Sequence, residues 1–240
     1  MKIHKLSHCC LVIDLKVSGE KSGESHENGH SRRILLDPGF YSVEKHIKVN
    51  KIDIVLITHE HADHFHIESL KELLRNHPDV EIVTNDTVGV ILSKEGIKHH
   101  IMEHGDVIDM KGVHIEAYGK DHALMHKSIA LVSNIGFLIE EKVADRSESN
   151  NISQKFFFPG DAFTPIDKEV DVLALPVSGP WMKISEAIDY ALQLKPKKAF
   201  PVHDAIRFGS AHTLPEKILG INGIEFIKLE EGGEILFTLN

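Results

Sequence analysis

Cysteine is almost absent from this sequence of 240 residues, which contains only Cys9 and Cys10. The two are neighbours in an apolar stretch, and adjacent residues of a strand point to opposite faces of the sheet. We therefore expect no disulfide between them, because their side chains would point apart. We interpret both as small strand residues and not as a redox pair.

Long apolar runs are also lacking. No stretch reaches the roughly 18 consecutive apolar residues of a membrane-spanning helix, and the short apolar run near the N-terminus is broken at Asp14, unlike the core of a secretory signal. We expect no membrane association and a cytoplasmic location. Basic residues are in deficit, since 36 acidic and 27 basic side chains give a net charge of −9. That balance disfavours a broad nucleic-acid-binding surface.

Histidine, in contrast, is abundant, with 18 residues. Three of them lie in the segment THEHADH at residues 58–64, directly after the apolar run of residues 52–57. Because side chains alternate along a strand, a turn at its end can direct His59 and His61 to one side and Asp63 and His64 to another. Imidazole and carboxylate are ligands for zinc, manganese and iron. The segment therefore predicts a site for two adjacent metal ions.

The pattern His-x-His-x-Asp-His resembles the signature of the metallo-β-lactamase fold superfamily. In that family a third histidine, a bridging aspartate and a last histidine follow along the chain. His122 in GKDHA, Asp161 in FFFPGD and His203 in AFPVHD stand at matching places. The resemblance covers nearly the whole chain. It implies an α+β fold, a four-layer αββα sandwich, formed by a single domain over residues 1–240.

The resemblance also implies how the ligands are shared. Three imidazoles would hold the first metal ion, a carboxylate and two imidazoles the second, and Asp161 would bridge them. The ligands so implied are His59, His61 and His122, then Asp63, His64 and His203. These donors are all nitrogen or oxygen and suit two divalent ions, Zn²⁺ or Mn²⁺, with iron as an alternative. A hydroxide between the ions is the expected nucleophile, and we count Asp63 and Asp161 as catalytic.

Three residues outside this set are candidates for binding substrate. His126 follows His122 by four residues, and Trp181 and Lys183 follow a strand in the glycine- and proline-containing segment LPVSGPWMK. They predict an apolar wall with cationic or neutral donors at its edge, which favours a small, anionic substrate. Asp204 is expected beside the site, where it could orient a ligand imidazole. Other histidines are expected to be structural: His66, His99, His100 and His104.

The apolar pattern is mostly one of short strands with a few amphipathic helices. The predicted helices are residues 65–76, 86–95, 184–194 and 213–220. The predicted strands are residues 9–15, 33–37, 53–58, 80–84, 113–118, 129–140, 155–159, 171–176, 198–203 and 234–239. Strands dominate the half up to about residue 118, and a second half follows.

Two polar stretches, residues 16–33 and 140–155, have too few apolar side chains to pack. Each joins two predicted strands, so we expect two long, mobile hairpin connections. His26 and His30, in the first of them, could bind metal, although an exposed polar loop is the simpler interpretation.

Within the superfamily, the segments NIGFLI and FPGD resemble the compact metal-dependent hydrolase branch, which includes L-ascorbate-6-phosphate lactonase-like proteins. This resemblance implies a hydrolase for a small ester, lactone or phosphoester. A nuclease or phosphodiesterase of the same fold and a non-catalytic metal-binding protein are the alternatives. The sequence does not decide the oligomeric state.

Overall fold

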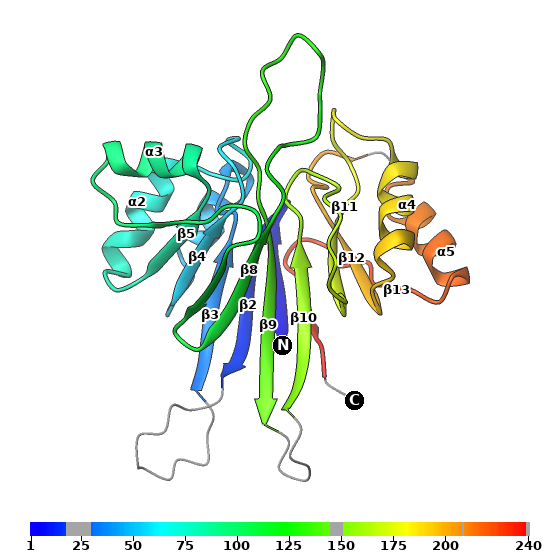
Figure 1. Cartoon of the computed structure of the whole chain (residues 1–240), viewed down its shortest axis with the longest axis horizontal. Helices are drawn as coiled ribbons and strands as arrows, with labels where there is room; N and C mark the ends of the chain where they lie inside the picture. The colour runs from blue at the N-terminus through cyan, green and yellow to red at the C-terminus, as the bar shows by residue number, and fades with distance from the viewer. Residues whose placement is uncertain (18–29, 145–150, 208, 239–240) are drawn as a thin grey trace.

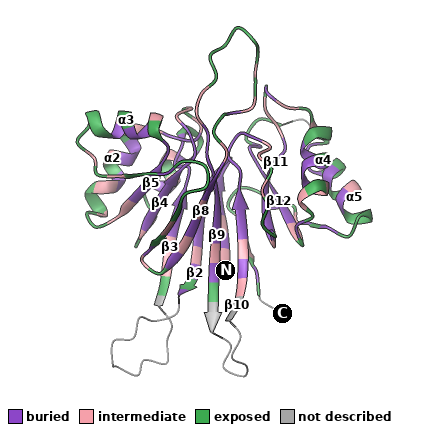
Figure 2. Cartoon of the chain, viewed as in Figure 1, coloured by how far each residue is buried: buried purple, intermediate pink, exposed green. Residues whose placement is uncertain are grey.

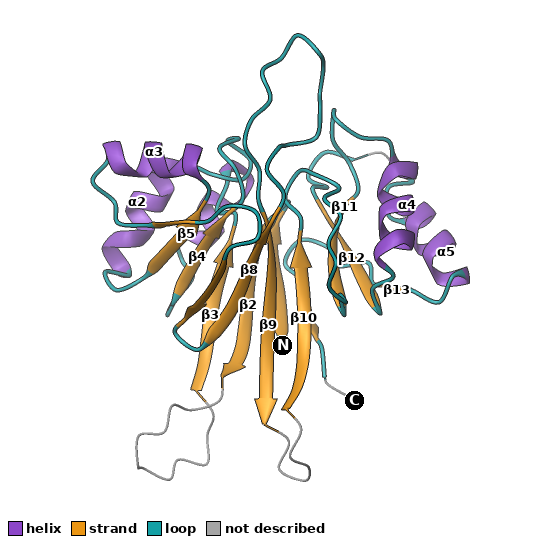
Figure 3. Cartoon of the chain, viewed as in Figure 1, coloured by secondary structure: helices purple, strands orange, loops and turns teal. Residues whose placement is uncertain are grey.

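The computed structural model describes residues 1–17, 30–144, 151–207 and 209–238. Within these ranges two seven-stranded sheets pack face to face, and helices cover their outer surfaces (Figures 1 and 3). The first sheet has the order β14-β1-β2-β3-β4-β5-β6, and the second the order β13-β12-β11-β10-β9-β8-β7. The predicted four-layer αββα sandwich is confirmed.

The strands of the first sheet are β1 (Lys2–Ser7), β2 (Cys10–Val17), β3 (His30–Leu36), β4 (Ile54–Ile57), β5 (Glu81–Thr84), β6 (His100–Ile101) and β14 (Glu234–Leu236). Those of the second are β7 (Val107–Met110), β8 (Val113–Tyr118), β9 (Gly136–Ala144), β10 (Asn151–Phe158), β11 (Val172–Pro176), β12 (Lys198–Val202) and β13 (Glu225–Phe226). The outer helices are α2 (Ile67–Asn76) and α3 (Asp86–Lys94) on the first sheet, and α4 (Ile184–Leu194) and α5 (Thr213–Ile221) on the second.

Both sheets combine antiparallel and parallel pairing in the same way. Strands β1 to β3 and β7 to β10 are antiparallel, whereas β3 to β6 and β10 to β13 are parallel. Helices α2 to α5 form the crossovers between successive parallel strands, as parallel pairing requires. As a result, several strands end at one edge of the sandwich, among them β1, β3, β4, β5, β8, β10, β11 and β12. The loops that follow them lie together there (Figure 1).

Apolar side chains fill three layers, one between the sheets and one under each pair of helices (Figure 2). Strand β4 shows why its sequence is apolar throughout. Ile54 and Leu56 face the other sheet, while Val55 and Ile57 pack with the helices of the first sheet. Strands buried on both faces read as continuous apolar runs. Such strands hold the polar residues at their ends rigidly.

Most predicted elements are present, and helix α4 has the predicted bounds. The prediction of a strand over residues 129–140 was wrong in its first half, because β9 begins at Gly136. Ile129 and Leu131, which suggested the strand, are about half exposed in the loop between β8 and β9. Strands β1, β6, β7 and β13 were not predicted. In the described part of the chain, no helix is long and apolar enough to cross a membrane.

The two polar stretches do connect antiparallel partners, β2 with β3 and β9 with β10, but their predicted bounds were too wide. Val17 pairs with His30, and Ala144 pairs with Asn151. Strands therefore continue into both stretches, and residues 18–29 and 145–150, with His26 among them, lie outside the described residues. The division between the halves also shifts, because β8 belongs to the second sheet and β14 returns to the first.

A buried histidine in the short helix α1 (Val43–His46) provides a test of the fold. His46 lies 2.8 Å from the hydroxyl oxygens of both Ser42 and Ser69 and so links α1 to α2. Burial, with a smaller effect from His66, lowers the pKa of His46 to about 4. The unfolded chain, in which His46 has its ordinary pKa near 6.5, takes up the proton first, so stability is lost as pH falls from about 6.5 to 4.

We expect the difference in unfolding free energy between the wild type and His46→Asn to shrink by about 2 kcal/mol from pH 7 to pH 5. The comparison cancels the other titrating groups, since both proteins contain them. Urea unfolding at several pH values measures this difference. A difference that stays constant over that range would show that His46 does not titrate as its burial requires.

Candidate metal centre

The site lies at this edge of the sandwich, beyond the ends of these strands (Figure 1). Strand β4 delivers the turn of residues 58–64, while β8, β10 and β12 lead to His122, Asp161 and His203. The structure brings all seven predicted ligands together, although they come from both sheets. Strands β1 and β3 add two residues that the sequence analysis missed, His8 and Asp37.

Asp37 stabilises the turn of residues 58–64 through hydrogen bonds to its first residue, Thr58. One carboxylate oxygen of Asp37 accepts a hydrogen bond of 2.8 Å from the backbone N–H of Thr58, and the other accepts one of 2.7 Å from the Thr58 hydroxyl. Gly39 packs against the same turn, where a Cβ atom would lie 1.8 Å from the carbonyl oxygen of Asp63. Any larger residue would displace the turn, so the glycine is a steric requirement of the site.

The candidate ligands form two clusters in which the ligand atoms lie within 4.8 Å of one another. One cluster contains His59, His61, His122 and Asp161, and the other contains His8, Asp63, His64 and His203. The division follows the one expected from the resemblance, with His8 as an addition. His8 lies between β1 and β2 with a left-handed backbone, and its Nε2 atom is 3.2 Å from Oδ2 of Asp63.

Asp161 occupies the space between the clusters. Its Oδ2 atom lies 2.9 Å from Nε2 of His203 and 3.4 Å from Nε2 of His122, and its Oδ1 atom lies 3.1 Å from Nε2 of His64. Asp161 follows Gly160, whose positive φ of 65° brings the backbone against Asn134. The Asn134 side chain in turn accepts a hydrogen bond of 3.0 Å from the Asp161 N–H. The turn thus fixes where this carboxylate points.

The electrostatics of the site are those of a cation-binding centre. Burial alone would raise the pKa of Asp161, but the charges of His64 and His203 and the close contact with His203 hold that pKa well below its usual range. Burial, reinforced by the charge of His64, lowers the pKa of His59. His59 is therefore a neutral imidazole at neutral pH, the form that binds metal.

Unpartnered buried atoms support a fit to metal ions. In the described part of the chain, four buried side-chain atoms have no hydrogen-bond partner, and three of these are Nε2 of His64, Nε2 of His122 and Oδ1 of Asp161. His64 and Asp161 are in contact, but without hydrogen-bond geometry. Buried polar atoms are rarely left unpaired in proteins. Ligation by a cation at this position would satisfy all three.

Hydrogen bonds on the far side of the imidazoles direct these rings toward the centre. The Nδ1 atom of His64 lies 2.6 Å from Asp37, and that of His122 lies 2.6 Å from the carbonyl oxygen of Ala123. Such contacts fix the tautomer and orientation of metal-binding histidines. Asp204 has no such role. It binds Lys5 and His212 at 2.6 and 2.8 Å and so anchors the loop after β12.

The three predicted substrate residues lie in different environments. Trp181 is buried against the metal site, Lys183 is exposed at the start of α4, and His126 is exposed in the loop between β8 and β9. His126 contacts Ser128, and the cavity beside the ligands is lined by Met125 instead. Cys9 and Cys10 are both free and buried, and the sulfur of Cys9 lies within 4.8 Å of ligand atoms of His64 and Asp161. Burial raises the pKa of the Cys9 thiol, which disfavours the thiolate form.

Trp181 contacts the carboxylate between the clusters. Its Nε1–H donates a hydrogen bond of 2.9 Å to Oδ2 of Asp161, and its ring meets His122 and His203 edge to face at 5.7 and 5.9 Å. The indole is therefore a positioning residue for Asp161, beyond the role at the pocket edge that the sequence suggested.

We expect Trp181→Phe to lower metal affinity or activity by roughly 10-fold. This is the lower end of the effect seen when a metal ligand loses its hydrogen-bonding partner. The phenyl ring keeps the aromatic contact with Phe163, so the change removes mainly the N–H donor. Competition with a chromophoric chelator measures the affinity. Tyr190→Phe is the matched control, since Tyr190 contacts the same Phe163 ring and the variant loses a hydrogen bond of 2.7 Å to the carbonyl oxygen of Thr164. Equal affinity in all three proteins would contradict the assignment.

The fold and the two ligand clusters define a protein of the metallo-β-lactamase fold with a candidate two-metal centre. Comparison with known families agrees, because the model of the beta-lactamase superfamily domain matches residues 24–203. The chain belongs to this superfamily, within the compact metal-dependent hydrolase branch.

Individual relatives cover most of the chain. Protein Rv0786c of Mycobacterium tuberculosis is 33% identical over 206 residues, covering 86% of this chain and 85% of its own length. The UPF0173 metal-dependent hydrolase MJ1163 of Methanocaldococcus jannaschii is 25% identical over 182 residues, covering 75% of this chain and 76% of its own. Igni18, a metallo hydrolase of Ignicoccus hospitalis, shares the fold with a TM-score of 0.70 and 19% identity, over 100% of this chain and 99% of its own.

Proposed function

We propose that this chain is a hydrolase that uses two divalent metal ions, one in each cluster, to cleave a small ester, lactone or phosphoester. The observation that carries the proposal is the position of Asp161, whose carboxylate is within 3.4 Å of Nε2 atoms from both clusters. A bridging ligand must reach both ions in this way. The names of several relatives, such as the UPF0173 metal-dependent hydrolases, support the same class of activity.

The donors suit Zn²⁺ or Mn²⁺, with iron as an alternative, because they are imidazoles and carboxylates. Two such ions would lower the pKa of a water held between them and would polarise the scissile carbonyl or phosphoryl group. His59, His61 and His122 would hold the first ion. Asp63, His64 and His203 would hold the second, with Asp161 shared.

The chain itself supplies orientation and charge. Asp63 is the most exposed carboxylate of the site and lies where the cavities on its two sides meet. Burial would raise the pKa of Asp63, but hydrogen bonds from His203 and His8 hold that pKa well below its usual range. Asp63 is thus an anion at neutral pH and can accept a hydrogen bond from the attacking water. In the reaction, the water oxygen bonds to carbon or phosphorus, the bond to the leaving oxygen breaks, and that oxygen takes up a proton.

The test is a substrate panel on protein loaded with Zn²⁺ or with Mn²⁺. It comprises p-nitrophenyl acetate, δ-valerolactone, p-nitrophenyl phosphate, bis(p-nitrophenyl) phosphate and a single-stranded oligonucleotide. We expect turnover of an ester, lactone or phosphoester that a chelator abolishes and added metal restores. Cleavage of the oligonucleotide alone would favour a nuclease. Protein that binds two ions but turns over nothing in the panel would favour a non-catalytic metal-binding protein.

A further inference from the structure

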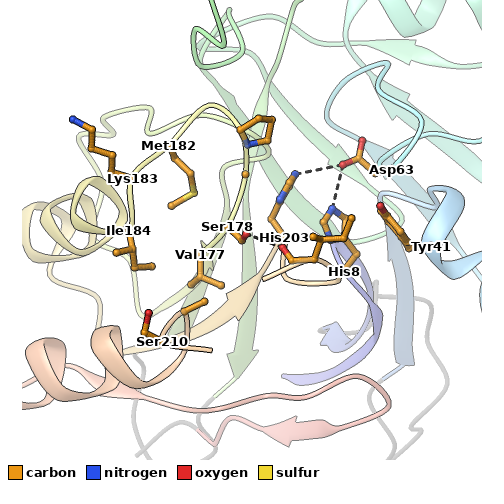
Figure 4. Close-up of a pocket in the computed structure, with 14 residues that line it drawn as sticks. His8, Tyr41, Asp63, Val177, Ser178, Met182, Lys183, Ile184, His203 and Ser210 are labelled. Atoms are coloured by element: carbon orange, nitrogen blue, oxygen red, sulfur yellow. Dashed lines mark hydrogen bonds and ion pairs between the residues drawn. The ribbon is translucent and has the colours of Figure 1, made fainter. Parts of the chain in front are cut away.

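A cavity of about 610 Å³ opens directly beside the second ligand cluster (Figure 4). His8, Asp63, Tyr41 and His203 form the end nearest the site. The cavity extends from there toward the start of α4 and the segment before α5, which supply Ile184 and Ala211. Its volume is within the range of sites that bind small molecules. A substrate held at the ligands would place one of its substituents in this space.

The lining away from the ligands is aliphatic. It includes Val177, Pro180, Met182, Ile184, Ile206 and Ala211. Two serines add hydroxyls. That of Ser178 already donates a hydrogen bond of 2.7 Å to the carbonyl oxygen of Ile206, and Ser210 is exposed to solvent. The surface offered to a bound substituent is therefore mainly apolar, and burying apolar atoms against it is favourable.

The distribution of charge in the cavity also favours an apolar substituent. Among the described residues that line it, Lys183 has the only basic side chain other than the histidines of the site. Lys183 is exposed, and in Figure 4 its ammonium end points away from His203 and Asp63. A carboxylate or phosphate buried beyond the ligands would lack a cationic partner, and burying an unpaired charge is costly. The anionic substrate expected from the sequence thus gains no support from this part of the site.

The mouth of the cavity is apolar as well. Ile206 is 73% exposed and Tyr41 is 40% exposed, and both line the cavity. Phe40, next to Tyr41, is 62% exposed. Tyr41 and Ile206 therefore extend the apolar lining of the cavity to its solvent-exposed part.

We infer that this cavity binds a neutral alkyl or acyl chain, and that the substrate is an ester or lactone with an apolar substituent of several carbons. The inference rests on the proposed function and narrows it. Met182 and Ile184, on the side of the cavity away from His8 and Asp63 (Figure 4), determine which chain lengths fit.

The test is a series of p-nitrophenyl esters, from acetate to octanoate, on metal-loaded protein. Each buried methylene should raise kcat/KM by about fourfold until the cavity is full. Hexanoate should thus exceed acetate on the order of 100-fold. The p-nitrophenyl monoester of adipic acid, in which a carboxylate replaces the terminal methyl group of the hexanoate chain, should be a poorer substrate than hexanoate.

Two variants locate the effect. Met182→Glu places a carboxylate in the cavity and should lower kcat/KM for hexanoate by about tenfold more than for acetate. Met125→Glu makes the same change in the cavity on the other side of the site and should leave the dependence on chain length as it is. Calorimetric titration with hexanamide and acetamide adds a readout without turnover, in which hexanamide should bind more tightly to the wild type than to Met182→Glu.

The outcomes separate the two proposals. Ester hydrolysis that is independent of chain length, or faster with the adipate monoester, would overturn the assignment of the cavity and leave the proposed hydrolase standing. If no substrate is turned over, the hydrolase proposal fails. Tighter binding of hexanamide that is lost in Met182→Glu would then still support the apolar site, and equal binding of both amides would overturn it.

Discussion

Replacing Asp161 with alanine is expected to leave a protein that cannot hold two metal ions and has almost no hydrolase activity. The variant removes the one anionic ligand within reach of both clusters. Two cations held roughly 3.5–4 Å apart then repel each other without a shared negative charge between them. Loss of at least one ion should follow. Removing a residue that only hydrogen-bonds to a metal ligand lowers activity roughly 10–100-fold. The fall in activity of Asp161→Ala should be larger than this.

Metal analysis after dialysis and the rate on the best panel substrate measure both effects. Asp161→Asn is the matched control, because it keeps the size of the side chain and one oxygen but removes the charge. It should retain more metal than the alanine variant and less than the wild type. If Asp161→Ala keeps both ions and the wild-type rate, the carboxylate does not bridge the clusters.

The second large effect is expected at Asp37, which touches no substrate. Its buried carboxylate accepts from the Thr58 N–H, from the Thr58 hydroxyl and from Nδ1 of His64. Asp37→Ala removes the acceptor of all three buried donors, and only the Thr58 hydroxyl keeps a second partner, Nδ1 of His59 at 3.0 Å. We expect a loss of about 3–5 kcal/mol of unfolding free energy, or a melting temperature lower by roughly 10 °C. Metal affinity should fall too, since His64 loses the contact that orients its ring.

Thermal unfolding of the metal-free protein isolates the first effect, and metal titration of the folded variant measures the second. Asp14→Ala provides the comparison, because Asp14 makes a paired contact with Arg33 in which both side chains are about one-third exposed, and Asp14 is in neither ligand cluster. That variant should change the melting temperature by only a few degrees. An Asp37→Ala protein as stable as Asp14→Ala would show that the carboxylate does not support the turn.

The ligands were predictable because each follows an apolar strand, and parallel strands bring their ends to one edge. His8 was missed because the sequence of β1, KIHKLS, contains two lysines and a histidine and does not have the apolar pattern that predicts a strand. Its Lys5 is fully buried, which is tolerated because the ammonium binds Asp204 and the carbonyl oxygen of Pro201 at 2.6 and 2.8 Å. Those partners lie almost 200 residues further along the chain. Because they are so distant in sequence, the local pattern of residues around Lys5 could not reveal that its side chain faces inward.

Other details depend on tertiary geometry in the same way. The hydrogen bond from Trp181 to Asp161 joins two loops, and only their relative placement shows that the indole reaches the carboxylate. The strand predicted to start at residue 129 failed for a related reason. Ile129 and Leu131 do not reach the core, and the backbone N–H of His122 pairs with the carbonyl oxygen of Val132 within the loop. Apolar content predicted burial there, but the loop rises beyond the edge of the sandwich (Figure 1).

The most direct test of the two-metal centre is anomalous diffraction from a crystal of the protein loaded with Zn²⁺, recorded on both sides of the zinc absorption edge. We predict two peaks. One should lie among His59, His61 and His122, the other among Asp63, His64 and His203, with the carboxylate of Asp161 contacting both. A single peak at full loading, or peaks held by residues outside this set, would contradict the account.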